Sequence, residues 1–136
     1  MSSLTAIQSK EIVVKVRNDV GILAQMTRIV AEKGVSVLAA AAWVEDTSGV
    51  IHMVTDDNLR ATDALRAHKY APEEKASLLV ELPHKPGMIS GLCGKLADGG
   101  INIRYLYMTA PINQDRCVLV LDTEDNERAM VILDEW

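Results

Sequence analysis

Residues 11–43, EIVVKVRNDVGILAQMTRIVAEKGVSVLAAAAW, and residues 77–109, SLLVELPHKPGMISGLCGKLADGGINIRYLYMT, are two versions of one pattern. The glycines at Gly21 and Gly34 both recur 66 residues later in the chain. An internal repeat of this kind defines the structural unit, which here is about 60–65 residues long. Two copies are too few for a solenoid, so the sequence predicts two small domains or one pseudo-symmetric pair.

In both copies the spacing of apolar residues changes along the chain in the same order. Apolar residues alternate over residues 12–16, as in a half-buried strand, and take helical spacing over residues 23–30 after a turn that contains glycine. A glycine ends that helix, and polar loops separate the elements that follow. We expect further strands at 35–44 and 50–55 and a short helix at 59–67, with counterparts of all five at 78–82, 89–96, 101–108, 117–123 and 126–133.

The predicted fold class is α+β, with two ferredoxin-like βαββαβ repeats over residues 10–70 and 76–136. In this arrangement both helices cover one face of an antiparallel sheet. A fourth strand of the first copy is expected around His68–Tyr70. The second copy reaches Trp136 without one, so either Leu4–Ile7 or another chain completes its sheet.

The sheet face opposite the helices is predicted to be apolar and to carry small side chains. The residues assigned to it are Leu38, Ala40, Ala42, Leu106 and Met108. An exposed apolar face favours association. Two alternatives remain: the two repeats bury these faces within one chain, or the chain also forms a homodimer. We expect the homodimer.

Composition excludes several classes of function. The chain has 14 Lys and Arg against 19 Asp and Glu, and only 4% aromatic residues, so it lacks the basic surface and stacking rings of a nucleic-acid binder. No apolar run approaches the roughly 18 residues that span a bilayer, and no signal pattern opens the chain. We therefore expect a cytoplasmic protein without nucleic-acid or membrane partners.

Catalytic and metal-binding patterns are weak. Cys93 and Cys117 do not form a disulfide framework, and with His52 and His84 they lack the spacing of metal ligands. The glycines of residues 87–94 do not follow the dinucleotide-binding pattern. No nucleophile and base are organised into a catalytic set. We expect no enzyme activity, no metal and no cofactor.

The turns before the first helix of each copy suit an anion. A glycine at a helix N-terminus leaves backbone N–H groups open beside the positive end of the helix dipole, and such a place binds carboxylates. Gly21 and Gly87 occupy these positions, and Pro86 sets the first turn without wasting a donor. The alternative is that glycine serves only the geometry of the turn.

The order of these motifs resembles the ACT domain, a family of small regulatory modules that bind amino acids and related metabolites. Lys85-Pro86-Gly87 and Gly100-Ile101-Asn102-Ile103 carry the resemblance best, and Asp19-Val20-Gly21 and Gly34-Val35-Ser36-Val37 follow it more loosely. The resemblance covers about residues 11–136, and the duplication is similar to stand-alone tandem ACT proteins.

The resemblance also implies where a ligand would bind. In ligand-binding ACT domains, a polar residue three before the turn glycine and an Asn fifteen after it share one site, often across a domain interface. Neither repeat has Asn at both positions, so Asn18 of one and Asn102 of the other are expected to make a composite site. The implied ligand-binding residues are Asn18, Asp19, Gly21, Ile22, Ser36, His84, Lys85, Gly87, Met88 and Asn102.

Two functions follow as hypotheses. The first is a non-catalytic regulatory module that binds a free amino acid at an interface between ACT domains and biases association or a partner enzyme. The second is a structural or protein-interaction module without a ligand. Binding of an amino acid distinguishes them.

Overall fold

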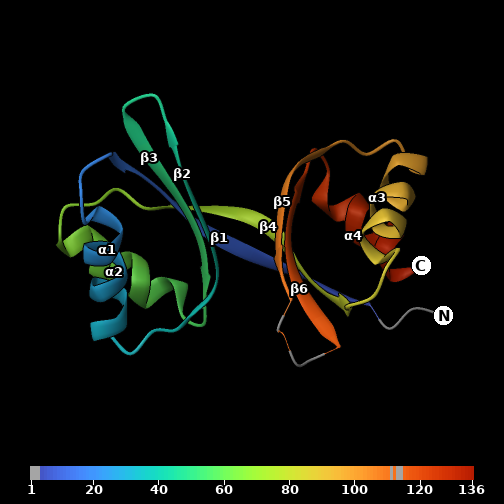
Figure 1. Ribbon diagram of the computed structural model, residues 1–136, viewed down its shortest axis with the longest axis horizontal. Coiled ribbons are helices and arrows are strands. Elements are labelled where there is room, and N and C mark those ends of the chain that lie inside the picture. The colour runs from blue at the N-terminus through green and yellow to red at the C-terminus, as the bar shows by residue number, and fades with distance from the viewer. Residues whose placement is uncertain (1–3, 111, 113–114) are drawn as a thin grey trace. The chain divides into compact units, whose positions relative to one another are not determined.

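The computed structural model describes residues 4–110, 112 and 115–136 of the chain. Ten elements follow one another in the order of two βαββα repeats (Figure 1). They are β1 (Thr5–Arg17), α1 (Ile22–Glu32), β2 (Val37–Glu45), β3 (Ser48–Thr55), α2 (Asn58–Ala67), β4 (Glu73–Pro83), α3 (Met88–Asp98), β5 (Ile103–Thr109), β6 (Arg116–Thr123) and α4 (Asn126–Asp134). The predicted α+β class and its ferredoxin-like repeats are confirmed. Residues 111, 113 and 114, in the loop between the strands predicted at 101–108 and 117–123, lie outside the described residues.

The chain divides into two compact units. The first unit is Lys10–Lys75, and the second unit is Met1–Ser9 together with Ala76–Trp136. Residues 1–9 and 71–75, which the predicted boundaries of 10–70 and 76–136 leave out, belong to these units. The strands β1 and β4 each contribute residues to both units, because each is longer than one unit needs.

In the first unit the strand order is β2-β3-β1-β4, and β4 enters it through Glu73–Lys75. The predicted strand around His68–Tyr70 was wrong. His68 is the C-cap of α2, and Lys69 has a φ of 68°, which breaks any extended run. The helices α1 and α2 lie on one face of the sheet (Figure 1), over a core that includes Ile12, Met26 and Leu65.

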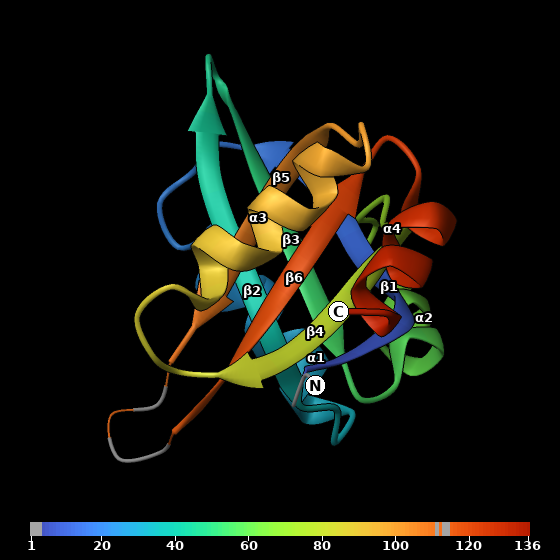
Figure 2. The same ribbon diagram turned by 90° about the vertical axis from the view of Figure 1, so that its right-hand side faces the viewer.

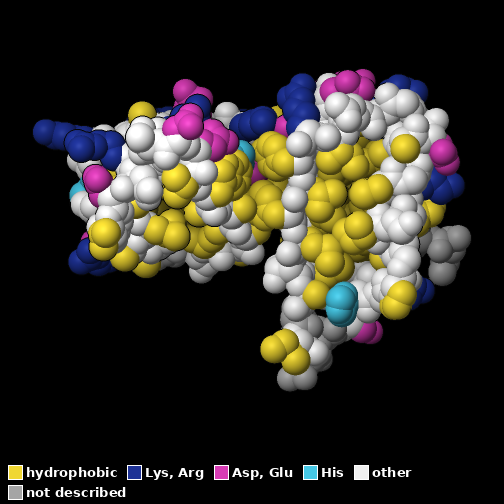
Figure 3. Space-filling model, turned by 45° about the horizontal axis from the view of Figure 1, so that its top comes forward, with side chains coloured by type: hydrophobic (Ala, Val, Ile, Leu, Met, Phe, Trp, Pro, Cys, Tyr) yellow, Lys and Arg dark blue, Asp and Glu magenta, His cyan; other side chains and the backbone are white. Residues whose placement is uncertain are grey.

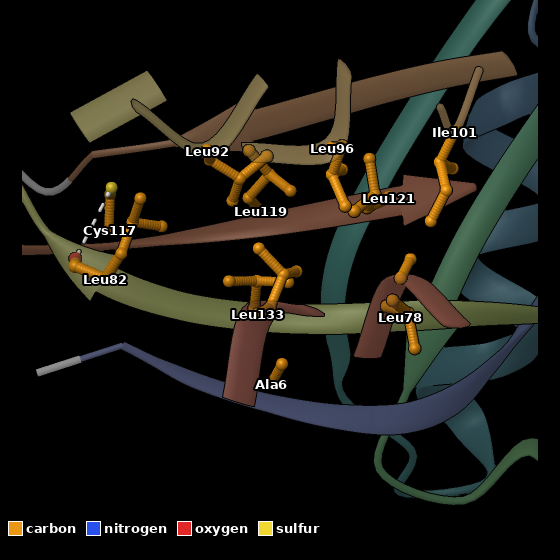
Figure 4. Packing of buried hydrophobic residues seen from close by; sticks show 12 residues of the cluster. Ala6, Leu78, Leu82, Leu92, Leu96, Ile101, Cys117, Leu119, Leu121 and Leu133 are labelled. Atoms are coloured by element: carbon orange, nitrogen blue, oxygen red, sulfur yellow. Dashed lines mark hydrogen bonds between the residues drawn. The ribbon is translucent and has the colours of Figure 1, made fainter. Parts of the chain in front are cut away.

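In the second unit the strand order is β1-β4-β6-β5, with β1 contributing its first residues. Ala6 is only 6% exposed and belongs to the same core as Leu78 and Leu133 (Figure 4). The N-terminal segment therefore completes this sheet, which is the first of the two alternatives that the sequence left open. The helices α3 and α4 lie over the strands on one face (Figure 2).

The pairing of the strands corrects the predicted composition of the open sheet face. Directly opposed residues of an antiparallel pair share a face. Ala40 and Ala42 lie opposite Met53 and Ile51, which are core residues on the helix side. Likewise Leu106 and Met108 lie opposite the core residues Leu121 and Leu119. These four residues therefore share the face that the helices cover, not the open one.

The open face carries a different set of side chains. In the first unit the register places Ala39, Ala41 and Trp43 of β2 opposite Val54, His52 and Val50 of β3. In the second unit it places Tyr105, Tyr107 and Thr109 of β5 opposite Asp122, Val120 and Val118 of β6. The errors arose because register shifts between Val37 and Ala39 in β2 and between Ile103 and Tyr105 in β5 each displace the alternation by one residue, and one residue exchanges the two faces of a strand.

The residues that end and cap the helices agree in part with those that the sequence predicts. Gly34 and Gly100 both have a φ of 73°, so the predicted left-handed glycines follow α1 and α3. The N-caps of the two short helices are aspartates. Asp57 caps α2 and Asp125 caps α4, in each case by accepting a backbone N–H three residues later at 3.1 Å.

Alanine substitution at two glycines of the second unit tests the backbone conformations that the structure assigns to them. Gly87→Ala should destabilise the protein by about 1–2 kcal/mol, because Gly87 has a φ of 90° that a Cβ disfavours. Gly94→Ala should stabilise it by about 0.5–1 kcal/mol, because Gly94 lies inside α3 and a Cβ added there would meet no atom within 4 Å. Thermal unfolding checks both, and equal shifts of one sign would contradict the assignment.

Candidate functional site

The site is built around the two glycine turns that the repeat singled out. Gly21 and Gly87 are the N-caps of α1 and α3, with left-handed φ angles of 83° and 90°. Within the described residues no side chain caps either helix, whereas α2 and α4 are both capped by aspartate. The first helix of each repeat therefore presents open N–H groups at a positive dipole end, where an anion is stabilised.

Neighbouring residues of each turn are held by backbone hydrogen bonds to the adjacent hairpin. The Asn18 N–H donates to the Thr47 carbonyl at 3.2 Å, and the His84 N–H donates to the Asp115 carbonyl at 2.6 Å. The Asp19 carbonyl accepts the Ile22 N–H at 3.2 Å, as the Lys85 carbonyl accepts the Met88 N–H at 3.4 Å. These bonds fix the turns while leaving the side chains exposed or half-buried.

Ile22 and Met88 are the first residues of their helices, and both pack partly buried against the core of their unit. Their side chains anchor the helix starts, and their backbone N–H groups already donate to the Asp19 and Lys85 carbonyls. The sequence-based assignment of a binding role to these two residues stays a prediction.

Ser36 and Asn102 lie at the other end of the first helix of each repeat. Ser36 donates its N–H to the Asp56 carboxylate at 2.9 Å, and its carbonyl accepts the Asp56 N–H at 3.1 Å. Asn102 makes the same reciprocal pair with Glu124, at 3.1 Å in both directions. The backbone of each position is therefore committed to the fold, and only the side chain remains for a ligand.

In each repeat, the turn glycine and the predicted Ser or Asn position lie at opposite ends of the first helix. Gly21 precedes α1 and Ser36 follows it, and the 11 residues of α1 span about 16 Å. The helix α3 separates Gly87 from Asn102 by the same length. A small ligand therefore does not reach both kinds of position within one repeat.

A surface pocket of about 530 Å³ lies in the first unit beside the first turn. It is lined by Lys15, Val16, Arg17, Asn18, Asp19, Thr47 and Ser48, so two of the predicted ligand residues belong to it. Gly21 and Ile22 are not part of the lining. Lys15 and Arg17, which share one face of the strand that leads into the turn, were not predicted from the sequence.

A buried polar pair was also missed. Glu11 is fully buried, and its Oε1 lies 3.1 Å from Nδ1 of His52, which is 6% exposed. The His52 ring stacks on Trp43 with ring centroids 4.9 Å apart. Glu11 precedes an alternating strand and reads as a solvated residue, so nothing in the sequence marked it as buried.

Features that would support catalysis are weak in the described residues. Among them, no three His, Cys, Asp or Glu residues gather in a way that would hold a metal ion. Cys117 is buried, and burial raises the pKa of its thiol above the ordinary value, with only partial opposition from the Arg116 charge. A raised pKa reduces the reactive thiolate, so Cys117 is a poor nucleophile. Its thiol donates to the Leu82 carbonyl instead (Figure 4).

None of the helices described by the structure has the length and apolar character that crossing a bilayer requires.

The fold and the paired glycine turns define a tandem pair of ferredoxin-like α+β modules. The chain belongs to the ACT domain pair family, whose model matches residues 6–135. No curated protein matches the sequence.

Solved structures share this fold. A protein of Bacteroides thetaiotaomicron is similar with a TM-score of 0.89 and 22% identity over 96% of this chain and 89% of its own. The ligand-free regulatory subunit of aspartate kinase from Thermus thermophilus is similar with a TM-score of 0.70 and 16% identity, over 98% and 97% of the two chains. At these identities the likeness shows the fold alone.

Proposed function

We propose that this protein is a non-catalytic regulatory module that binds a free amino acid at its ACT domains. The observation that carries the proposal is the pair of open helix starts behind Gly21 and Gly87, repeated in a chain of this family. Open amides at a helix N-terminus suit a carboxylate, and every free amino acid carries one.

The residues beside the first turn suit the rest of an amino acid. Asn18 offers both a donor and an acceptor, and Asp19 offers a carboxylate for an α-ammonium group. Both side chains are exposed and line the same pocket. The turn therefore combines groups for both charges of a zwitterion.

The length of α1 supports our proposal that another ACT domain completes the site. Because α1 separates Gly21 from Ser36, a ligand that uses both types of position joins two domains. We propose that the chain works as a homodimer and that a regulated enzyme responds to ligand binding through altered association. Aspartate kinase regulatory subunits of the same fold support a role of this kind.

One observation favours the alternative of an interaction module without a ligand. Hydrophobic side chains reach the surface of both units (Figure 3), and Leu38, Trp43 and Val44 on β2 are 41–55% exposed. Exposed apolar residues on one strand suit a protein partner. We rank this alternative second, because it assigns no binding role to the open N–H groups at the two glycine turns.

A thermal-shift screen of the twenty amino acids separates the two functions. An amino acid at 100 times its dissociation constant should stabilise the protein by about 2.7 kcal/mol and raise its melting temperature by several degrees. A flat response to all twenty would leave the interaction module as the better explanation.

The same assay locates the site with single variants. Asn18→Ala and Asn102→Ala should each weaken the shift of the active amino acid, whereas Gln8→Ala, an exposed amide on β1, should leave it unchanged. An Asn102→Ala protein with unaltered affinity would remove Asn102 from the site.

A further inference from the structure

The pocket of the first unit has an unusual balance of charge. Lys15 and Arg17 lie two residues apart on β1, so both point to the same face of the strand. Neither forms an ion pair with any residue in the described ranges. Two neighbouring cations without a counter-ion repel each other, and an anion bound between them relieves that repulsion.

The rest of the lining provides polar groups around these cations. Thr47 and Ser48 bring hydroxyl groups from the β2–β3 hairpin, and Asn18 brings an amide. The hydrogen bond from the Asn18 N–H to the Thr47 carbonyl ties β1 to the hairpin and so holds the two walls together. Asp19 is the one carboxylate of the lining. Its carbonyl accepts the Ile22 N–H, which connects the pocket to the start of α1.

The corresponding place in the second unit has a different chemistry. The strand registers match, since Lys15 lies opposite Val50 and Arg17 opposite Ser48, while Glu81 lies opposite Val118 and Pro83 opposite Arg116. Glu81 and Pro83 thus replace the two cations of the first unit.

At this place in the second unit, the charged side chains form an ion pair with each other. The Arg116 Nε lies 2.9 Å from Oε1 of Glu81 and donates a hydrogen bond to it. Lys85 stands where the first unit has Asp19, at the same place before the turn glycine. A ligand of the first turn therefore meets two cations and a carboxylate, a combination that the second turn lacks.

We propose that the ligand of the first unit is an acidic amino acid. Lys15 and Arg17 bind its side-chain carboxylate, Asp19 binds its α-ammonium group, and the open amides at the start of α1 bind its α-carboxylate. This assignment rests on the proposed amino-acid binding and adds the class of ligand. It also explains why Lys15 and Arg17 form no ion pair with the residues that the structure describes, because the ligand supplies a counter-ion.

Isothermal titration of the full chain with matched ligands tests the proposal. Aspartate and glutamate should bind at least about tenfold more tightly than asparagine and glutamine, because charge-assisted hydrogen bonds are roughly twice as strong as neutral ones. Raising the salt concentration should narrow this difference, since exposed charges are screened. Inorganic phosphate serves as a simple anion for comparison.

A pair of double variants identifies the residues responsible. Lys15→Gln with Arg17→Gln should abolish the preference for the acidic ligands. Arg28→Gln with Lys33→Gln removes the same charge from exposed positions of the first unit and should preserve it. Circular dichroism and melting temperature confirm that both double variants are folded.

The outcomes separate this inference from the proposed function. If the neutral amino acids bind as tightly as the acidic ones, or if the preference survives in the Lys15 and Arg17 variant, the acidic-ligand assignment is wrong while amino-acid binding stands. If phosphate binds through Lys15 and Arg17 and no amino acid binds, both proposals are overturned.

Discussion

Leu121→Ala is expected to lower the free energy of unfolding by about 3 kcal/mol. Leu121 is fully buried on β6, where it lies opposite Leu78 of β4 and Leu106 of β5. Removing its side chain loses apolar burial and leaves a cavity in the core of the second unit. Chemical denaturation in urea measures the change as a lower midpoint.

Leu59→Ala is the matched control, because Leu59 is the same residue type but 70% exposed on α2. It should change the free energy of unfolding by no more than about 0.5 kcal/mol. If the two variants unfold at the same urea concentration, Leu121 does not occupy the core that the strand register assigns to it.

His52→Leu is expected to destabilise the protein by about 3 kcal/mol. The buried Glu11 side chain loses the imidazole nitrogen 3.1 Å from its Oε1, and removing one partner of a buried pair is costly because the other polar group stays buried. Leucine preserves apolar volume against Trp43, so the effect reports mainly on the polar pair. The measurement is again urea denaturation.

A double variant makes this prediction specific. Glu11→Leu combined with His52→Leu should recover about 1–3 kcal/mol relative to His52→Leu alone, because both buried polar groups are then removed together. If the two single effects simply add, Glu11 and His52 are not energetically coupled, and the contact between them contributes little.

The sequence was sufficient for the repeat and for the order of its elements. Hydrophobic periods identified strands and helices because one face of each is buried, and Gly34 and Gly100 marked helix ends because only glycine takes their φ angles cheaply. The family resemblance rested on these features, and the match over residues 6–135 confirms it.

Three features of the structure were not predicted from the sequence, each for a different physical reason. The bulge after Val37 exchanges the faces of β2, and periodicity alone does not locate a bulge. The extra strand at Glu73–Lys75 belongs to β4, so a search for a separate strand near His68–Tyr70 was misplaced. The burial of Glu11 depends on a histidine 41 residues away, which no local pattern reveals.

The candidate site was predicted only in outline. The turn glycines and their uncapped helices were found because glycine before a helical period is a local signal. Lys15 and Arg17 were passed over because cations on a strand usually face solvent, and their meaning emerges only from the pocket and from the contrast with Glu81.

Nuclear magnetic resonance of the amide groups tests amino-acid binding at the glycine turns most directly. Titration of the labelled chain with aspartate or glutamate should shift the backbone amide signals of residues 21, 23 and 24 progressively to saturation, because these N–H groups would become donors to the ligand carboxylate. Saturable shifts confined to other parts of the chain, or none with any of the twenty amino acids, would contradict amino-acid binding at these turns.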